Sequence, residues 1–308
     1  MSFSGKVKEE LAKQISSARH CKIAEISALL HTCGKFDTAK KLHFHAENDA
    51  VVRKYFTLLK KTFNIDTEIS VRESSYSVTL NDETQIKKVL EGTKLVCEEL
   101  ESGALSLNSK LVIQQSCCKR AYIRGAFLAS GSISDPEKGY HFEIVCFDEE
   151  RARQLQDMIR SFDIDAKIVL RKKSYVVYVK EGAQIVDLLA VMEANVSLMN
   201  LENIRIVKEM RNSINRRVNC ETANINKTVN AAVKQTEDIK LVEKMVGFQN
   251  LNSSLAEIAE LRLRYPEATL KELGMMLDPQ VGKSGVNHRL RKLSEMADEL
   301  RKNEEELL

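Results

Sequence analysis

The residues best suited to chemistry lie near the end of the chain, in the segment KSGVNHRLRK at residues 283–292. This segment contains four basic residues, one histidine and one asparagine, and it contains no acidic residue. Arginine and lysine bind guanine edges and phosphates, and asparagine can bind adenine, so a helix that carries them can read a major groove. The residues that we predict to contact DNA here are Lys283, Ser284, Asn287, His288, Arg289, Arg291 and Lys292.

A second basic segment covers residues 205–234, where seven basic residues accompany two acidic ones and asparagines recur between them. Asparagine is a poor helix former, so its frequency in a segment without glycine or proline indicates a function. Basic side chains neutralise phosphates, and asparagine can bond to backbone oxygens or adenine edges. A solvated helical linker is the alternative. The residues predicted to contact DNA in this segment are Arg211, Asn215, Arg216, Arg217, Asn219, Asn224 and Lys227.

Metal and nucleophile chemistry has less support in the sequence. The seven cysteines show no CxxC spacing, and two adjacent cysteines, Cys117 and Cys118, are poorly placed for a structural disulfide or a zinc site. Free thiols are therefore expected. His43 and His45 lie on the same face of an expected strand, near His31 and Cys33 in sequence, which leaves a transition-metal site as an alternative. We predict no cofactor and no resident metal.

Two distant segments repeat each other, and they indicate how the elements of the chain are organised. AEISALLHTCG at residues 24–34 aligns with AYIRGAFLASG at residues 121–131, and further similarity follows in the same order downstream. Similarity sustained over roughly 65 residues indicates a duplicated domain.

Each copy predicts the same order of elements. In the first copy we expect a helix at residues 23–33 that ends in a left-handed Gly34, a strand at 41–46 and an amphipathic helix capped by Asn48 or Asp49. Strands at 67–72 and 76–80 and a helix at 83–90 follow. The second copy repeats this order, with strands at 140–146, 166–170 and 175–179. The fold class is therefore α+β for the duplicated part.

Three short helices are expected after residue 250. Ser254 and Thr269 are each followed three residues later by a glutamate, which is the pattern of a capping box, and Ser284 is expected to cap the third helix. Their order is typical of an all-α helix-turn-helix domain. The residues of the third helix expected in the core are Val286, Leu290, Leu293 and Ala297.

These patterns predict four segments: a first repeat at residues 1–100, a second at 101–200, a basic Asn-rich helical linker at 201–250 and a helix-turn-helix domain at 251–308. The chain has 308 residues, of which 43% are hydrophobic and 30% charged, as expected of a globular protein with more than one domain. It has no apolar run of membrane-spanning length, and its first residues read as an amphipathic helix, so we expect a protein of the cytoplasm.

The repeated helix that ends in glycine, followed by strand pairs, resembles the LAGLIDADG homing endonucleases. The resemblance implies that two such helices pack about a pseudo-two-fold axis and that their sheets form a saddle. Ala28 and Gly125 occupy the position of the motif's glycine, so we expect close helix packing. In that family the last acidic residue of each motif holds the catalytic metal, and here those positions are Cys33 and Ser130.

A thiol and a hydroxyl do not replace carboxylates as magnesium ligands. Because phosphodiester cleavage depends on that metal, we predict no nuclease activity and therefore no enzyme. An endonuclease with other metal ligands, such as Asp37 and Asp135 beyond the two glycines, is the alternative.

The segments RRVNCETAN and SGVNHRLRKL, together with the degenerate saddle, resemble the WhiA family of bacterial sporulation and cell-division regulators over nearly the whole chain. The resemblance implies a transcription regulator that binds double-stranded DNA in the nucleoid. It also implies a small partner regulator or RNA polymerase as a further partner, and we expect a monomer. A nucleoid architectural protein without a preferred site is another alternative. The basic hairpin of the second repeat leaves open whether the saddle binds DNA or protein.

Overall fold

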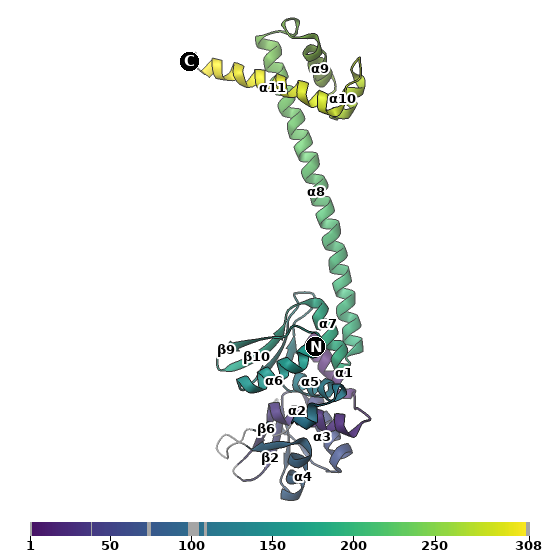
Figure 1. Cartoon of the computed structure of the whole chain (residues 1–308), viewed down its shortest axis with the longest axis vertical. Coiled ribbons are helices and arrows are strands. Elements are labelled where there is room, and N and C mark those ends of the chain that lie inside the picture. Colours follow the sequence, from purple (N-terminus) through teal and green to yellow (C-terminus); the bar gives the residue numbers. More distant parts are fainter. Residues whose placement is uncertain (1, 38, 73–74, 98–104, 108–109, 306–308) are drawn as a thin grey trace. The chain divides into compact units, whose positions relative to one another are not determined.

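The computed structural model describes residues 2–37, 39–72, 75–97, 105–107 and 110–305 (Figure 1). The chain divides into two compact units, Met1–Glu209 and Met210–Leu308. Each unit has a hydrophobic core of its own. Helix α8 (Asn195–Met245) contributes residues to both units.

The first unit contains two copies of one arrangement, preceded by helix α1 (Phe3–Lys13). The first copy consists of α2 (Arg19–Cys33), β1 (Gly34–Phe36), β2 (Leu42–Ala46), α3 (Asp49–Phe63), β3 (Ile69–Arg72), β4 (Ser75–Leu80) and α4 (Glu83–Thr93). The second consists of α5 (Ser116–Ser130), β7 (Gly131–Ile133), β8 (Phe142–Cys146), α6 (Glu149–Arg160), β9 (Lys167–Arg171), β10 (Ser174–Val179) and α7 (Gly182–Met192). Between them lie β5 (Leu95–Cys97), β6 (Leu105–Leu107) and the short helix η1 (Lys110–Ile113).

The two sheets have the same topology, which supports the duplication predicted from the sequence. Their strand orders are β1-β2-β4-β3 and β7-β8-β10-β9, and every neighbouring pair is antiparallel. The helices and strands expected in both copies are present, and Asn48 caps α3 by accepting a hydrogen bond from the backbone N–H of Ala50. The predicted α+β fold with two equivalent repeats is therefore confirmed.

The backbone at the two helix-ending glycines differs from the prediction. Gly34 has φ −78° and ψ 144°, and Gly131 has φ −81° and ψ 155°, so neither is left-handed. Each glycine instead leads the chain from its helix directly into a strand. A Cβ atom at Gly34 would lie 2.5 Å from the Leu30 carbonyl oxygen, and one at Gly131 would lie 2.7 Å from that of Phe127. Glycine is needed at these positions because no room remains for a side chain.

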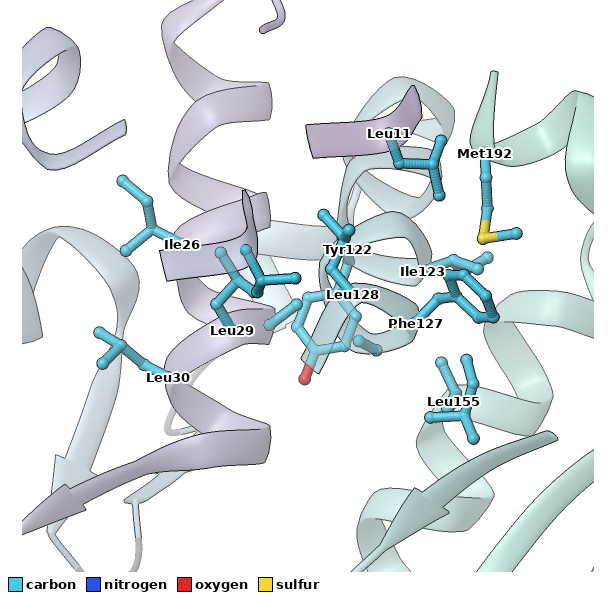
Figure 2. Packing of buried hydrophobic residues seen from close by; sticks show 14 of the residues in the cluster. Leu11, Ile26, Leu29, Leu30, Tyr122, Ile123, Phe127, Leu128, Leu155 and Met192 are labelled. Atoms are coloured by element: carbon cyan, nitrogen blue, oxygen red, sulfur yellow. The ribbon is translucent and has the colours of Figure 1, made fainter. Parts of the chain in front are cut away.

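The central helices α2 and α5 pack against each other along their length, and their apolar side chains fill the core on both sides (Figure 2). The smallest residues lie at the point of closest approach. A Cβ atom at Gly125 would lie 2.7 Å from the Glu25 carbonyl oxygen and 2.8 Å from the Cβ of Ala28. The close packing expected of Ala28 and Gly125 is therefore confirmed.

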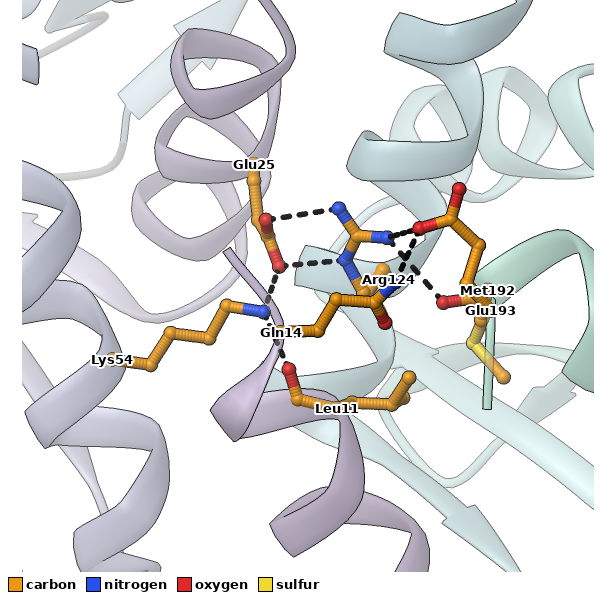
Figure 3. A network of polar contacts seen from close by, with 7 residues as sticks. All are labelled: Leu11, Gln14, Glu25, Lys54, Arg124, Met192 and Glu193. Carbon is orange, nitrogen blue, oxygen red and sulfur yellow. Dashed lines mark hydrogen bonds and ion pairs between the residues drawn. The ribbon is translucent and has the colours of Figure 1, made fainter. Parts of the chain in front are cut away.

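A buried network of charges crosses the same helix pair (Figure 3). The carboxylate of Glu25 on α2 lies 2.5 Å from Lys54 Nζ on α3 and 3.0 Å from Arg124 Nε on α5, and all three side chains are almost fully buried. Arg124 also reaches Glu193, which ends α7, at 2.8 Å. Because an uncompensated buried charge is costly, this network favours one pairing of the two repeats.

The second unit is a helical domain whose core begins in α8. It contains the end of α8, the short helix η2 (Phe248–Asn250), α9 (Ser253–Arg264), α10 (Leu270–Met276) and α11 (Lys283–Glu305). Ile239 and Val242 of α8 are buried together with the core residues of the three following helices. Asp238 of α8 also accepts a hydrogen bond of 2.6 Å from Arg301 of α11. The predicted core residues Val286, Leu290, Leu293 and Ala297 are all buried, which confirms the expected inner face of α11.

Two of the three predicted helix caps were wrong. The side chain that caps α9 belongs to Asn252, which accepts from the Ser254 backbone N–H, and Ser254 lies inside the helix. Helix α11 begins at Lys283, one residue before Ser284, and its first backbone acceptor is the Gly282 carbonyl. The capping box of Thr269 and Glu272 is confirmed, with hydrogen bonds of 2.7 and 3.3 Å. Among the described helices, none is long and apolar enough to cross a membrane.

We predict that Gly125→Ala destabilises the first unit by about 1–3 kcal/mol, because the added methyl group must push apart two packed helices. Gly139→Ala is the matched control, since a Cβ atom there would meet no atom within 4 Å. Urea denaturation of the full chain, followed by circular dichroism, measures both changes. Equal unfolding midpoints for the two variants would contradict close packing at Gly125.

A pH dependence follows from His31 at the same interface. Burial, with a smaller effect of the Arg151 charge, lowers the pKa of His31 from 6.5 to about 3, and its Nδ1 lies 2.6 Å from the Tyr122 hydroxyl. The unfolded chain takes up a proton near pH 6.5 while the folded chain does not, so stability is lost as the pH falls from 6.5 toward 3. The expected loss between pH 7 and pH 5 is about 2 kcal/mol.

Denaturation at the two pH values tests this expectation. His31→Gln should reduce the dependence on pH, whereas the same substitution at His288, which is exposed, should leave it unchanged. An equal slope in the wild-type chain and in His31→Gln would refute the assignment.

Candidate nucleic-acid interface

Helix α11 packs one face into the core, so its opposite, polar face is exposed. Val286, Leu290 and Leu293 are buried at helical spacing. Ser284, His288 and Arg291 follow each other at intervals of four and three residues on the other side of the helix, and all three are exposed. Asn287 and Lys292 flank them and are also exposed. The first acidic residue on this face is Glu295, which pairs with Arg291 at 2.9 Å.

Two predicted contact residues lie nearer to the core face of the helix. Arg289 is half-buried, and its Nη1 donates to the Ser254 carbonyl oxygen at 3.4 Å, so it connects α11 to the start of α9. Lys283 is exposed in the first turn of α11. The positions of these residues favour phosphate or structural contacts more than base contacts.

The turn before α11 depends on a residue that the sequence analysis did not single out. A Cβ atom at Gly274 in α10 would lie 2.0 Å from the Val281 carbonyl oxygen, and the backbone N–H of Val281 donates to the Gly274 carbonyl at 2.9 Å. Glycine therefore allows the segment before α11 to lie directly on α10. The only sign of this role in the sequence was a glycine in the middle of a short predicted helix.

Arg262 is a second positioning residue that the sequence analysis missed. Its guanidinium is buried, and Nη1 donates to the carbonyl oxygens of Ala268 at 2.7 Å and Pro266 at 3.3 Å. It thereby holds the turn between α9 and α10. No sequence signal distinguished Arg262 from the neighbouring exposed Arg264.

A groove of about 970 Å³ in the second unit brings together predicted residues from two segments. Lys227 of α8 lines it together with Lys283 and Asn287 of α11. Arg262 of α9 and Thr269, which caps α10, line another side. Two basic side chains and an amide that the sequence predicted, from separate segments, therefore face one concave surface, which Glu237 and Glu267 also line.

The remaining predicted residues of α8 are exposed along the helix and do not enter this groove. They are Arg211, Asn215, Arg216, Arg217, Asn219 and Asn224. Within the second unit, Arg216, Lys227 and Lys234 succeed each other at intervals of 11 and 7 residues, which places them on one side of the helix. Exposed apolar residues such as Ile214 and Val218 lie on another side.

The positions that match the nuclease motif also meet in the structure. Cys33 ends α2 and Ser130 ends α5, and both line one cavity of about 440 Å³ together with His43 and His45. None of the described residues that line this cavity is acidic. Burial raises the pKa of the Cys33 thiol to about 11, and the Ser130 hydroxyl donates to the Val145 carbonyl at 2.7 Å. Both groups are therefore neutral at physiological pH.

The two alternative carboxylates, Asp37 and Asp135, accept hydrogen bonds from nearby residues of their own repeats. Asp37 accepts from the Lys41 backbone N–H at 2.8 Å and from His43 Nε2 at 2.8 Å. Asp135 accepts from the Glu137 backbone N–H at 3.0 Å. Each aspartate belongs to its own loop, and neither lines the cavity.

The outer face of the second sheet carries both charge and apolar surface. Lys167 and Arg171 are exposed on β9, and Arg171 lies 3.5 Å from Glu143. Val145, Phe147 and Val169 are exposed on the same part of the molecule, with Phe147 65% exposed. The basic residues of this face would suit DNA, and its apolar residues would suit a protein, so the choice between the two partners stays open.

Comparison with known proteins gives a consistent result along the chain. Residues 19–96 match the family model of the WhiA N-terminal LAGLIDADG-like domain, residues 119–211 that of the WhiA LAGLIDADG-like domain, and residues 214–297 that of the WhiA C-terminal HTH domain. The crystal structure of full-length WhiA from Thermotoga maritima aligns with a TM-score of 0.60 at 23% identity, covering 97% of this chain and 99% of that one.

Among curated relatives, a probable cell division protein WhiA of Lachnoclostridium phytofermentans is 58% identical, and the match covers 98% of this chain and 100% of the relative. One from Clostridium botulinum is 47% identical, with 98% and 99% covered. The fold and the candidate interface define a protein with duplicated LAGLIDADG-like repeats and a C-terminal helix-turn-helix domain. The chain belongs to the WhiA family.

Proposed function

We propose that this protein is a sequence-specific regulator of transcription that binds double-stranded DNA through the first half of α11. The observation that carries the proposal is the exposed face of α11, which is polar and basic until Glu295 and is held by a rigid core on the other side. Ser284, His288 and Arg291 are placed to reach base edges, with Asn287 and Lys292 beside them. Relatives named as probable cell division proteins support a role in cell division.

Helix α8 supplies sequence-independent affinity in this proposal. Arg216, Lys227 and Lys234 share one side of the helix, and in this proposal they neutralise phosphates of the same duplex, with Lys227 nearest to α11. Lys227 and Lys283 line the same groove, so the phosphate contacts of α8 and the base contacts of α11 meet there. Such a protein works in the cytoplasm, on the nucleoid. A small partner regulator or RNA polymerase as a further partner, and a monomeric state, remain predictions.

The proposal includes the absence of nuclease activity. The cavity at the former catalytic position is lined by the neutral Cys33 and Ser130 and, among described residues, by no carboxylate. A divalent ion that activates water for phosphodiester cleavage requires such anionic ligands.

Selection from a random duplex library with the full chain, at near-physiological salt, tests for a preferred site. Arg291→Gln should then weaken binding to the selected site by about 10- to 100-fold, because a bidentate base contact contributes about 1–3 kcal/mol. Its effect on random DNA should be much smaller. Fluorescence anisotropy titrations measure both affinities.

Lys302→Gln is the matched control, because it removes one charge from the exposed, mixed-charge end of the same helix. Lys227→Gln should weaken specific and random binding alike and lower the salt dependence by about one counterion. Equal losses for Arg291→Gln and Lys302→Gln would argue against base readout by α11. A library that yields no preferred sequence would support an architectural protein instead.

Incubation of supercoiled plasmid with the full chain and magnesium or manganese should give no nicked or linear product. The physical reason is the neutral donor set at Cys33 and Ser130. Asp37→Asn and Asp135→Asn serve as controls, since cleavage that either variant abolishes would establish an endonuclease with other ligands. Cleavage retained by both variants would also contradict the proposal if it recurs in independent preparations, and would indicate a contaminating nuclease if it does not.

A further inference from the structure

Four potential metal ligands meet where the two central helices begin. His20 and Cys21 are the second and third residues of α2, and Cys117 and Cys118 are the second and third residues of α5. The alignment of Ala24 with Ala121 makes the two pairs equivalent positions of the two repeats. Each pair is adjacent in sequence, and the contact between the repeats brings the pairs together.

The donor atoms already have the spacing of a coordination shell. His20 Nδ1 lies 3.2 Å from Cys118 Sγ, 3.4 Å from Cys21 Sγ and 3.9 Å from Cys117 Sγ. The ligand atoms of all four residues lie within 4.8 Å of one another. A tetrahedral zinc ion, with bonds of about 2.3 Å to sulfur and 2.0 Å to nitrogen, separates its ligands by about 3.5–3.8 Å.

We propose that His20, Cys21, Cys117 and Cys118 form a site for one tetrahedral thiophilic divalent cation, with zinc as the expected ion. Three sulfur donors and one imidazole are the donor set of many structural zinc sites, and they disfavour magnesium and calcium. Four protein ligands leave no open position, so the ion holds structure and does not activate water.

The surroundings of the four residues suit such an ion. Cys21 and Cys118 are buried on a small apolar cluster with Val112, Ala24 and Ala121, while His20 and Cys117 are exposed and give access from solvent. Two helices begin here, and the positive ends of their dipoles stabilise thiolates. Cys21, Cys117 and Cys118 are free thiols. Outside this group of four residues, the Cys117 thiol donates to Gln115 Oε1 at 3.5 Å.

The protonation of the thiols predicts how binding depends on pH. A metal ion binds thiolates, so it must displace the protons of the thiols, and affinity should increase with pH.

This site is separate from the positions that bind the catalytic metal in the nuclease motif. Cys33 and Ser130 lie at the C-terminal ends of α2 and α5, and the four ligands lie at the N-terminal ends. A bound ion would join the two repeats through one residue pair from each. This proposal departs from the prediction of no resident metal. That prediction was based on Cys117 and Cys118 alone and did not include His20 and Cys21.

Titration of the reduced, chelator-treated full chain with Co²⁺ tests the proposal. One equivalent should produce the visible bands of tetrahedral Co²⁺ and a near-ultraviolet thiolate charge-transfer band, and Zn²⁺ should bleach both. Metal analysis of protein purified without chelator should find about one zinc per chain. A wild-type chain that gives no such bands would overturn the proposal, as would a purified chain that carries a Cys21–Cys118 disulfide and no metal.

Variants locate the site. His20→Gln alters an exposed residue, so it should fold normally and weaken Co²⁺ binding by at least about tenfold. Cys118→Ser should remove part of the thiolate band, and Cys220→Ser is the matched control, because Cys220 is exposed on α8. Circular dichroism verifies folding of each variant. Bands that are unchanged in both His20→Gln and Cys118→Ser would show that the ion binds elsewhere and would sink the assignment.

Discussion

The close approach of α2 and α5 is the constraint on which the first unit depends. The missing side chain at Gly125 lets the backbone of α2 lie against α5, with the Cβ of Ala28 directly opposite it. Each helix packs against its own sheet, so this contact also fixes the two sheets relative to each other. It brings Cys33 next to Ser130 at one end and His20 next to Cys118 at the other. A small change at the helix crossing would therefore be transmitted to both ends.

Local patterns in the sequence predicted most of the elements, because helix periodicity and strand alternation extend over few residues. The inner face of α11 and the Thr269 capping box belong to this group. Competing signals were harder to resolve. Asn252 and Ser254 can both cap a helix, and the sequence gives no reason to prefer the former. The backbone of Gly34 depends on the strand that follows it, and a glycine alone does not reveal that.

The contacts of the fold and of the candidate site that sequence reasoning could not predict are those between distant residues. Glu25 pairs with Arg124, and His31 bonds to Tyr122, across the interface between the repeats. The sequence around Glu25 or His31 therefore does not reveal its partner. Gly274 and Arg262 position α11 through contacts with backbone carbonyls, which residue types do not encode. The exposure of Ser284, His288 and Arg291 on α11 was predictable because it follows from the opposite, buried face of the helix.

The buried network around Glu25 also bears on how a duplicated protein can diverge. By the alignment of the two repeats, Arg124 corresponds to Ser27, and Glu25 corresponds to Tyr122. Two copies of the first repeat would place Glu25 opposite a serine, and two copies of the second would place Arg124 opposite a tyrosine. Either symmetric assembly would bury a charge without its partner across the interface. At this network the two halves are thus complementary and not interchangeable, although the backbone and aligned residues such as Gly34 and Gly131 keep the symmetry of the duplication.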